Sequence, residues 1–153
     1  MTSNTGKLAM SIYSFSMTKF AGDVLQRVQD SISVENRVKT SYTPYSFELI
    51  LEIEINEAKH AKLACICEHR QEERWIVQAT IEYDKQSWSL SKSFNIVNDE
   101  NVRDMALAAS NSILKGISLL QMICDKEQAL EQIVDEMKET INQIAISSGF
   151  KSN

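Results

Sequence analysis

Cys65, Cys67 and His69 carry side chains able to bind metal or act as nucleophiles, and they occupy alternate positions in one short segment. In an extended strand this spacing points all three side chains to one side, as a metal site or a Cys–His nucleophile pair requires. The same side also carries Leu63, and free cysteine is among the residue types most often buried as a small hydrophobe. The C-x₂₋₄-C spacing of zinc sites is absent, and a fourth ligand would have to come from elsewhere, such as Cys124. We therefore expect reduced core cysteines that bind no metal.

The other candidates for acid–base chemistry are a histidine and a row of carboxylates. His60 is predicted in the first hairpin loop with a parity opposite to that of His69, so the two histidines do not converge. Glu48, Glu52 and Glu54 would line one side of a strand as potential paired carboxylates, but alternating Glu more often solvates a strand and prevents edge-to-edge aggregation. The sequence contains no nucleophile-elbow, phosphate-loop, dinucleotide-binding or zinc-protease motif. Catalysis is thus the less favoured interpretation, and no cofactor is expected.

Composition favours a soluble, acidic, globular protein. The 153 residues suit one domain, and 43% apolar with 24% charged residues is ordinary for globular proteins. Sixteen Lys and Arg against 21 Asp and Glu give a net charge of −5, with no basic stripe of the kind that binds nucleic acid. The polar N-terminus lacks a signal-peptide layout, no apolar run approaches 18 residues, and three cysteines do not suggest a disulfide framework. We expect a cytoplasmic location, with neither membrane nor nucleic acid as a partner.

The spacing of apolar residues predicts the elements that position these side chains. Intervals of three to five between Leu8 and Ile32 predict an amphipathic helix. Glu35–Tyr42 lacks a pattern and is predicted to be a polar linker that ends at Pro44. Strict alternation then predicts four strands, joined by hairpins into an antiparallel meander, over Ser46–Ile55, Ala61–Cys67, Trp75–Tyr83 and Trp88–Ile96.

Helical spacing returns after Asn98 and Asp99, which are suited to an N-cap. A resemblance to a capping box at Asp125 favours two helices with a break there, and the alternative is one kinked helix of nearly fifty residues. The prediction is a single α+β domain over residues 1–153, with an N-terminal helix, a four-stranded antiparallel meander and two C-terminal helices packed on one sheet face. Residues 1–7 and 147–153 are expected to be flexible tails. This outline is loosely similar to export chaperones of the SecB type, but the N-terminal helix departs from it and no motif matches, so no family is assigned.

Two surface features suggest contact with other molecules. Ile50, Ile66 and Ile76 are expected to form an apolar strip on the sheet face opposite the core. The last strand of the meander is a free edge that could accept an added strand, and its outer face carries Ser87, Ser89, Ser91 and Ser93.

These features favour a small acidic protein that acts by binding another protein, as an inhibitor, immunity factor, adaptor or chaperone does, and that forms a homodimer. The alternative is an enzyme or a small-ligand-binding domain with a pocket between sheet and helices, near Trp75, Tyr83 and Trp88.

Overall fold

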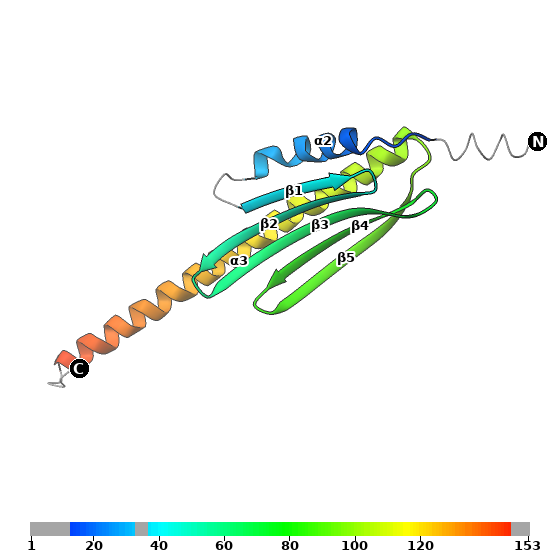
Figure 1. Ribbon diagram of the computed structural model, residues 1–153. Helices are drawn as coiled ribbons and strands as arrows, with labels where there is room; N and C mark the ends of the chain where they lie inside the picture. The colour runs from blue at the N-terminus through cyan, green and yellow to red at the C-terminus, as the bar shows by residue number, and fades with distance from the viewer. Residues whose placement is uncertain (1–12, 33–36, 148–153) are drawn as a thin grey trace, which may run out of the picture. The chain divides into compact units, whose positions relative to one another are not determined.

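The computed structural model describes residues 13–32 and 37–147. Helix α2 (Met17–Val28) runs into a 3₁₀ turn, η1 (Gln29–Ser31), and precedes a β-sheet, and helix α3 (Asp99–Ser147) follows the sheet. The chain divides into two compact units, Met1–Leu120 and Gln121–Asn153. The sheet, α2 and the first part of α3 belong to the first unit, and the architecture is α+β (Figure 1).

The sheet is an antiparallel meander in which strands adjacent in sequence are adjacent in space (Figure 1). The antiparallel meander is confirmed, but the sheet has five strands and not the four that the sequence predicts. In the pairing of β2 with β3, Glu52 opposes Lys62 and Ile53 opposes Ala61, and the register shifts only beyond Glu54. The five strands are β1 (Arg37–Thr43), β2 (Ser46–Asn56), β3 (Lys59–Gln71), β4 (Arg74–Tyr83) and β5 (Gln86–Asn95).

Strand β1 occupies most of the segment predicted to be a polar linker, so that prediction was wrong. The side of β1 that faces the core carries Val38, Thr40 and Tyr42, which oppose Leu51, Leu49 and Phe47 of β2. Along β1 the β-propensity alternates from residue to residue, whereas the hydropathy does not. β-Branched and aromatic side chains favour a strand whether or not they are apolar. Pro44 lies in the two-residue turn to β2 and does not end a linker.

Helix α2 packs on the apolar face of the sheet, here called the inner face. Ser16 caps the helix, and its hydroxyl oxygen accepts a hydrogen bond from the backbone N–H of Lys19 at 3.3 Å. Phe20 then meets Phe47 edge-on at 5.9 Å between ring centroids. The predicted start of this helix at Leu8 lies outside the described residues, and Ser14 to Ser16 are not helical.

Helix α3 is continuous over 49 residues, so the prediction of two helices was wrong and the single-helix alternative is the one observed. Asp125 caps nothing; its carboxylate accepts a hydrogen bond from the side-chain amide of Gln121 at 3.0 Å, one turn earlier. With neither Gly nor Pro nearby, no residue forces a break. The predicted N-cap is present, because Asn98 Oδ1 accepts from the backbone N–H of Asn101 at 2.8 Å.

The core of the first unit lies between the inner face and the two helices. From α3 it receives Met105, Ala106, Ala109, Ile113 and Leu120, all at most 1% exposed. Among the described residues, α3 is the one helix long and apolar enough to cross a membrane by length and composition. The most apolar stretch of this helix is 28% buried, and the five side chains named above lie in the core.

Candidate functional site: exposed apolar surfaces of β5 and α3

The thiols of β3 belong to the core, as the sequence predicts. Cys65 and Cys67 have no exposed area, and the Cys65 thiol donates to the carbonyl oxygen of Ala109 at 3.9 Å. Two causes raise the pKa of Cys67 far above that of a free thiol. The larger is a hydrogen bond with Cys65, and the second is burial of the thiol. A nucleophilic or metal-binding cysteine has to be a thiolate, so the surroundings of Cys67 oppose both roles.

His69 does not join the two thiols in a site. Its Nε2 contacts the backbone carbonyl of Glu72, and its ring lies edge-on to Trp75 at 5.3 Å between centroids. His60 lies on the opposite face of β3, opposite Glu54. No cluster of three or more potential metal ligands occurs within residues 13–32 and 37–147.

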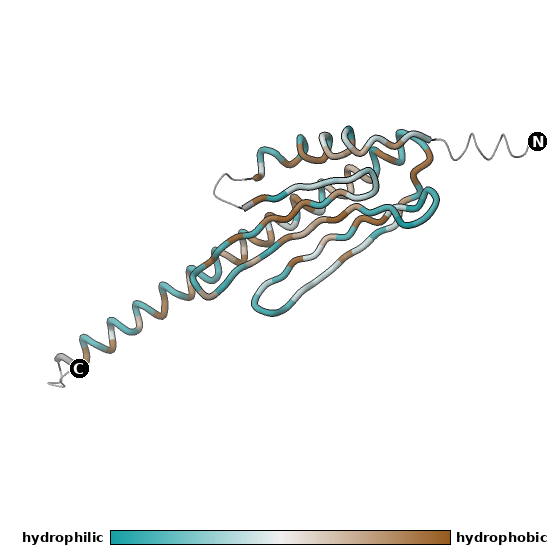
Figure 2. Tube along the Cα trace, viewed as in Figure 1, coloured by the Kyte–Doolittle hydropathy of each residue, from teal (hydrophilic) through white to brown (hydrophobic). Residues whose placement is uncertain are grey.

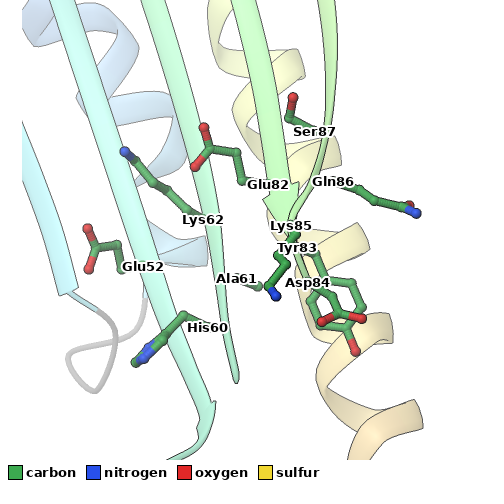
Figure 3. A pocket seen from close by; sticks show the side chains of 10 residues that line it. All are labelled: Glu52, His60, Ala61, Lys62, Glu82, Tyr83, Asp84, Lys85, Gln86 and Ser87. Atoms are coloured by element: carbon green, nitrogen blue, oxygen red, sulfur yellow. The ribbon is translucent and has the colours of Figure 1, made fainter. Parts of the chain in front are cut away.

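A pocket of about 480 Å³ lies on the outer face, at the hairpin ends of β2, β3, β4 and β5 (Figure 3). Glu52, Lys62 and Glu82 form a row across three strands there, and their charges alternate in sign. Alternating charges on neighbouring strands attract each other, which favours the sheet without requiring a ligand. Of the three aromatic residues expected around a ligand pocket, Tyr83 lines this one, whereas Trp75 is buried and Trp88 is exposed.

The structure places the three isoleucines of the outer face on a diagonal. Ile66 opposes Glu48 on one side and Gln78 on the other, which makes Ile50 and Ile76 its diagonal neighbours. All three are partly buried and lie outside the buried core. They form a narrow apolar strip across β2, β3 and β4.

Strand β5 presents an open edge. In the described part of the chain β4 is its sole neighbour, and ten residue pairs join the two strands without a register shift. A two-residue turn at Asp84 and Lys85, both with positive φ, closes on the pair Tyr83 and Gln86. Such a closing pair forms two backbone hydrogen bonds across the hairpin. In β5 the N–H and C=O groups of Gln86 and of every second residue after it therefore face β4, and those of the residues between them face away from β4. The residues whose N–H and C=O groups face the open edge are therefore Ser87, Ser89, Ser91 and Ser93.

The inner side of β5 is not covered by the helices. Trp88 and Leu90 are 54% and 75% exposed, although both continue the alternation that predicts a core position. Burial decreases along β4, from Trp75 and Val77 in the core to Ile81, which is only partly buried. The boundary of the core therefore runs along β4.

The exposure of Trp88 and Leu90 was not predicted from the sequence, because the whole apolar face of the sheet was expected to lie under helices. Lys92 was the available signal. It shares their side of β5, and its ammonium lies 5.3 Å from the ring centroid of Phe94. A charged group at that position indicates that solvent reaches the end of the face.

A second exposed apolar surface lies in the second unit. Figure 2 shows apolar residues recurring at each turn of α3 toward its C-terminal end. We call this surface the C-terminal stripe; each of its side chains is at least 47% exposed, and its residues are Leu130, Ile133, Val134, Met137, Ile141 and Ile144. Large contiguous apolar patches on soluble proteins mark sites of contact.

No protein-family model, curated protein or solved structure matches the chain. The function is therefore argued from these surfaces.

Proposed function

We propose that the protein is a binding module that holds an extended segment of another polypeptide along β5. The observation that carries this proposal is an open, regular strand edge with Trp88 and Leu90 exposed beside it. An added strand would pair with the backbone groups of the four serines, and its alternate side chains would contact Trp88 and Leu90. The proposal requires no catalysis and no cofactor.

The edge of β5 lacks most of the features that normally prevent strand addition. Natural edges are short, bulged, rich in charge or interrupted by proline. Strand β5 has ten residues, no register shift and no proline, and Lys92 is its one charged residue. A solvated edge that has no partner is usually better protected, so these features favour a strand that receives one.

The partner suited to this edge is an extended segment in which apolar residues alternate with polar ones. Every second side chain of the partner would lie against Trp88 and Leu90. The side chains between them would lie on the outer face beside the serines, near the end of the isoleucine strip, where Ile76 opposes Ser93. The net charge of −5 favours encounter with a basic partner.

A single-residue block of the edge tests the proposal. Proline at position 91 removes an N–H that faces the open edge and leaves the ladder to β4 intact, which is where edge strands tolerate proline. The wild-type protein should enrich linear peptides with alternating apolar residues from a displayed random library. Ser91→Pro should weaken the affinity of the best peptide by about tenfold or more, as expected for lost backbone pairing.

The matched control is Ser91→Ala, which removes the hydroxyl but keeps the N–H and should bind as the wild type does. Leu90→Lys should weaken binding through the inner side of the same strand, and circular dichroism verifies the fold of each variant. Failure to enrich any such peptide, or equal affinity in Ser91→Pro and the wild type, would show that β5 is not the binding edge.

A further inference from the structure

The C-terminal stripe contains a seam with the spacing of a coiled coil. Leu130, Val134, Met137, Ile141 and Ile144 are separated by four, three, four and three residues. Alternating intervals of this kind keep one narrow line of side chains on a single side of a helix, which is the side that a second helix contacts. All five residues are between 47% and 61% exposed.

The same heptad series begins in the first unit, where it is buried. Counting back from Val134 in sevens gives Glu127 and then Leu120, Ile113 and Ala106, and these last three are each at most 1% exposed beneath the sheet. The same heptad spacing thus serves the core of the first unit and, after the interruption at Glu127, the second unit, where its apolar members are exposed. Its buried half shows that this side of α3 is suited to close packing.

We propose that the seam pairs with the seam of a second copy of this chain, with the two helices antiparallel. A second copy carries a seam of the same spacing, and a twofold axis lets identical surfaces meet. This interface lies on α3 and is separate from the strand edge proposed for a partner polypeptide.

The charge of the polar side disfavours a membrane surface as the occupant. Amphipathic helices that lie on membranes carry mainly Lys and Arg on their polar side. Residues 121–144 contain six acidic residues and two basic ones. A segment with this excess of acidic residues would be repelled by anionic lipids, whereas a second helix contacts only the seam and the residues that flank it.

Charge also selects the antiparallel orientation. Glu127 occupies the seam position before Leu130, and two parallel copies would place the Glu127 carboxylates directly against each other. In an antiparallel pair centred between Val134 and Met137, Glu127 meets the far end of the seam instead. The same arrangement brings Glu131 of each copy beside Lys138 of the other, so the twofold axis generates two attractive pairs.

The oligomeric state of the full chain tests the proposal. Wild-type protein at tens of micromolar should have the mass of a dimer in sedimentation equilibrium. Val134→Glu combined with Ile141→Glu places two carboxylates in the seam and should raise the dissociation constant by roughly a hundredfold or more, since burial of unpaired charge opposes association. The matched control is Ala129→Glu with Asn142→Glu, which adds the same charge away from the seam and should remain dimeric.

A charge exchange tests the orientation. Glu131→Lys and Lys138→Glu should each weaken the dimer alone, and together they should restore it, because the pairs between antiparallel helices are re-formed with reversed sign. In a parallel pair Glu131 would face Lys126, so the double exchange would not restore association.

A monomeric wild type, an assembly larger than a dimer, or a seam variant that still dimerises would each overturn the helix pairing. A double exchange that fails to restore the dimer would overturn the antiparallel arrangement. The seam variant should still enrich the same peptides at β5, so failure of one proposal is distinguishable from failure of the other.

Discussion

Gly116 lies where α3 passes over the side chain of Leu63. A Cβ at position 116 would lie 2.5 Å from Leu63 Cδ1 and 3.2 Å from its Cγ, and Leu63 is fully buried. Glycine normally weakens a helix interior because it gains backbone entropy on unfolding. Here the missing side chain is what lets the helix approach the sheet, so this glycine has a structural reason that helix propensity alone does not provide.

Gly22 and Gly116, which both lie in described helices, should respond in opposite ways to the same change. Gly22→Ala should raise the free energy of unfolding by about 0.5–1 kcal/mol, because nothing lies within 4 Å of the added methyl group. Gly116→Ala gains the same helix propensity, but the added methyl group overpacks against Leu63, which typically costs about 1–3 kcal/mol. The Gly116→Ala protein should therefore be less stable than the wild type. Urea denaturation of both variants measures the difference, and equal stabilisation of both would show that the contact with Leu63 relaxes freely.

The strength of the local pattern decided which elements could be predicted from the sequence. Alternation of large apolar residues over β2, β3 and β4 predicts their existence, order and buried side, since a shift by one residue would turn the whole apolar set to solvent. Strand β1 was not predicted, because Val38 is the single aliphatic residue on its inner side. The continuity of α3 was not predicted, because a residue type that caps helices, such as Asp125, also fits a helix interior when its side chain has a partner there.

The candidate surfaces were predictable in part. The free edge of the last strand follows from meander order, and the parity of its serines follows from alternation. The exposure of Trp88 and Leu90 depends on how far two helices extend across five strands. No local spacing encodes that width, because it depends on the packing of segments far apart in the sequence.

The two opposite faces of strand β3 should respond differently to the same substitution. Leu63→Lys should cost more than about 3 kcal/mol, because it places an unpaired ammonium in the core. Ile66→Lys should change stability by less than about 1 kcal/mol, since position 66 lies on the outer face opposite Glu48. Thermal unfolding followed by circular dichroism measures both, and an equally large loss for Ile66→Lys would mean that both faces are covered.

At the scale of the whole molecule, stability is concentrated in the first unit. Every buried apolar side chain in the described part of the chain lies between Met17 and Leu120. The second unit is a helical segment whose stripe is exposed, and isolated helices of this kind gain little from propensity alone. The fold and the proposed self-association thus depend on different stretches of the sequence.

A chain ending after Gln128 should separate these two properties. It retains two helical turns beyond Leu120 and the whole core, so its free energy of unfolding should fall by less than about 1 kcal/mol. It should also be monomeric, because the seam from Leu130 onward is absent. Denaturant unfolding and sedimentation of the shortened chain check both outcomes, and loss of cooperative unfolding would show that the second unit contributes to the core.

The position of α3 at the end of the sheet-forming sequence has a consequence for synthesis on the ribosome. The meander is complete at Asn95, yet the inner face remains without its second helix until residues 105–120 have been made. Until then the nascent chain holds five strands whose apolar face only α2 can cover, a state prone to aggregation. The timing of translation through this stretch therefore governs how long the growing chain is exposed to misassembly.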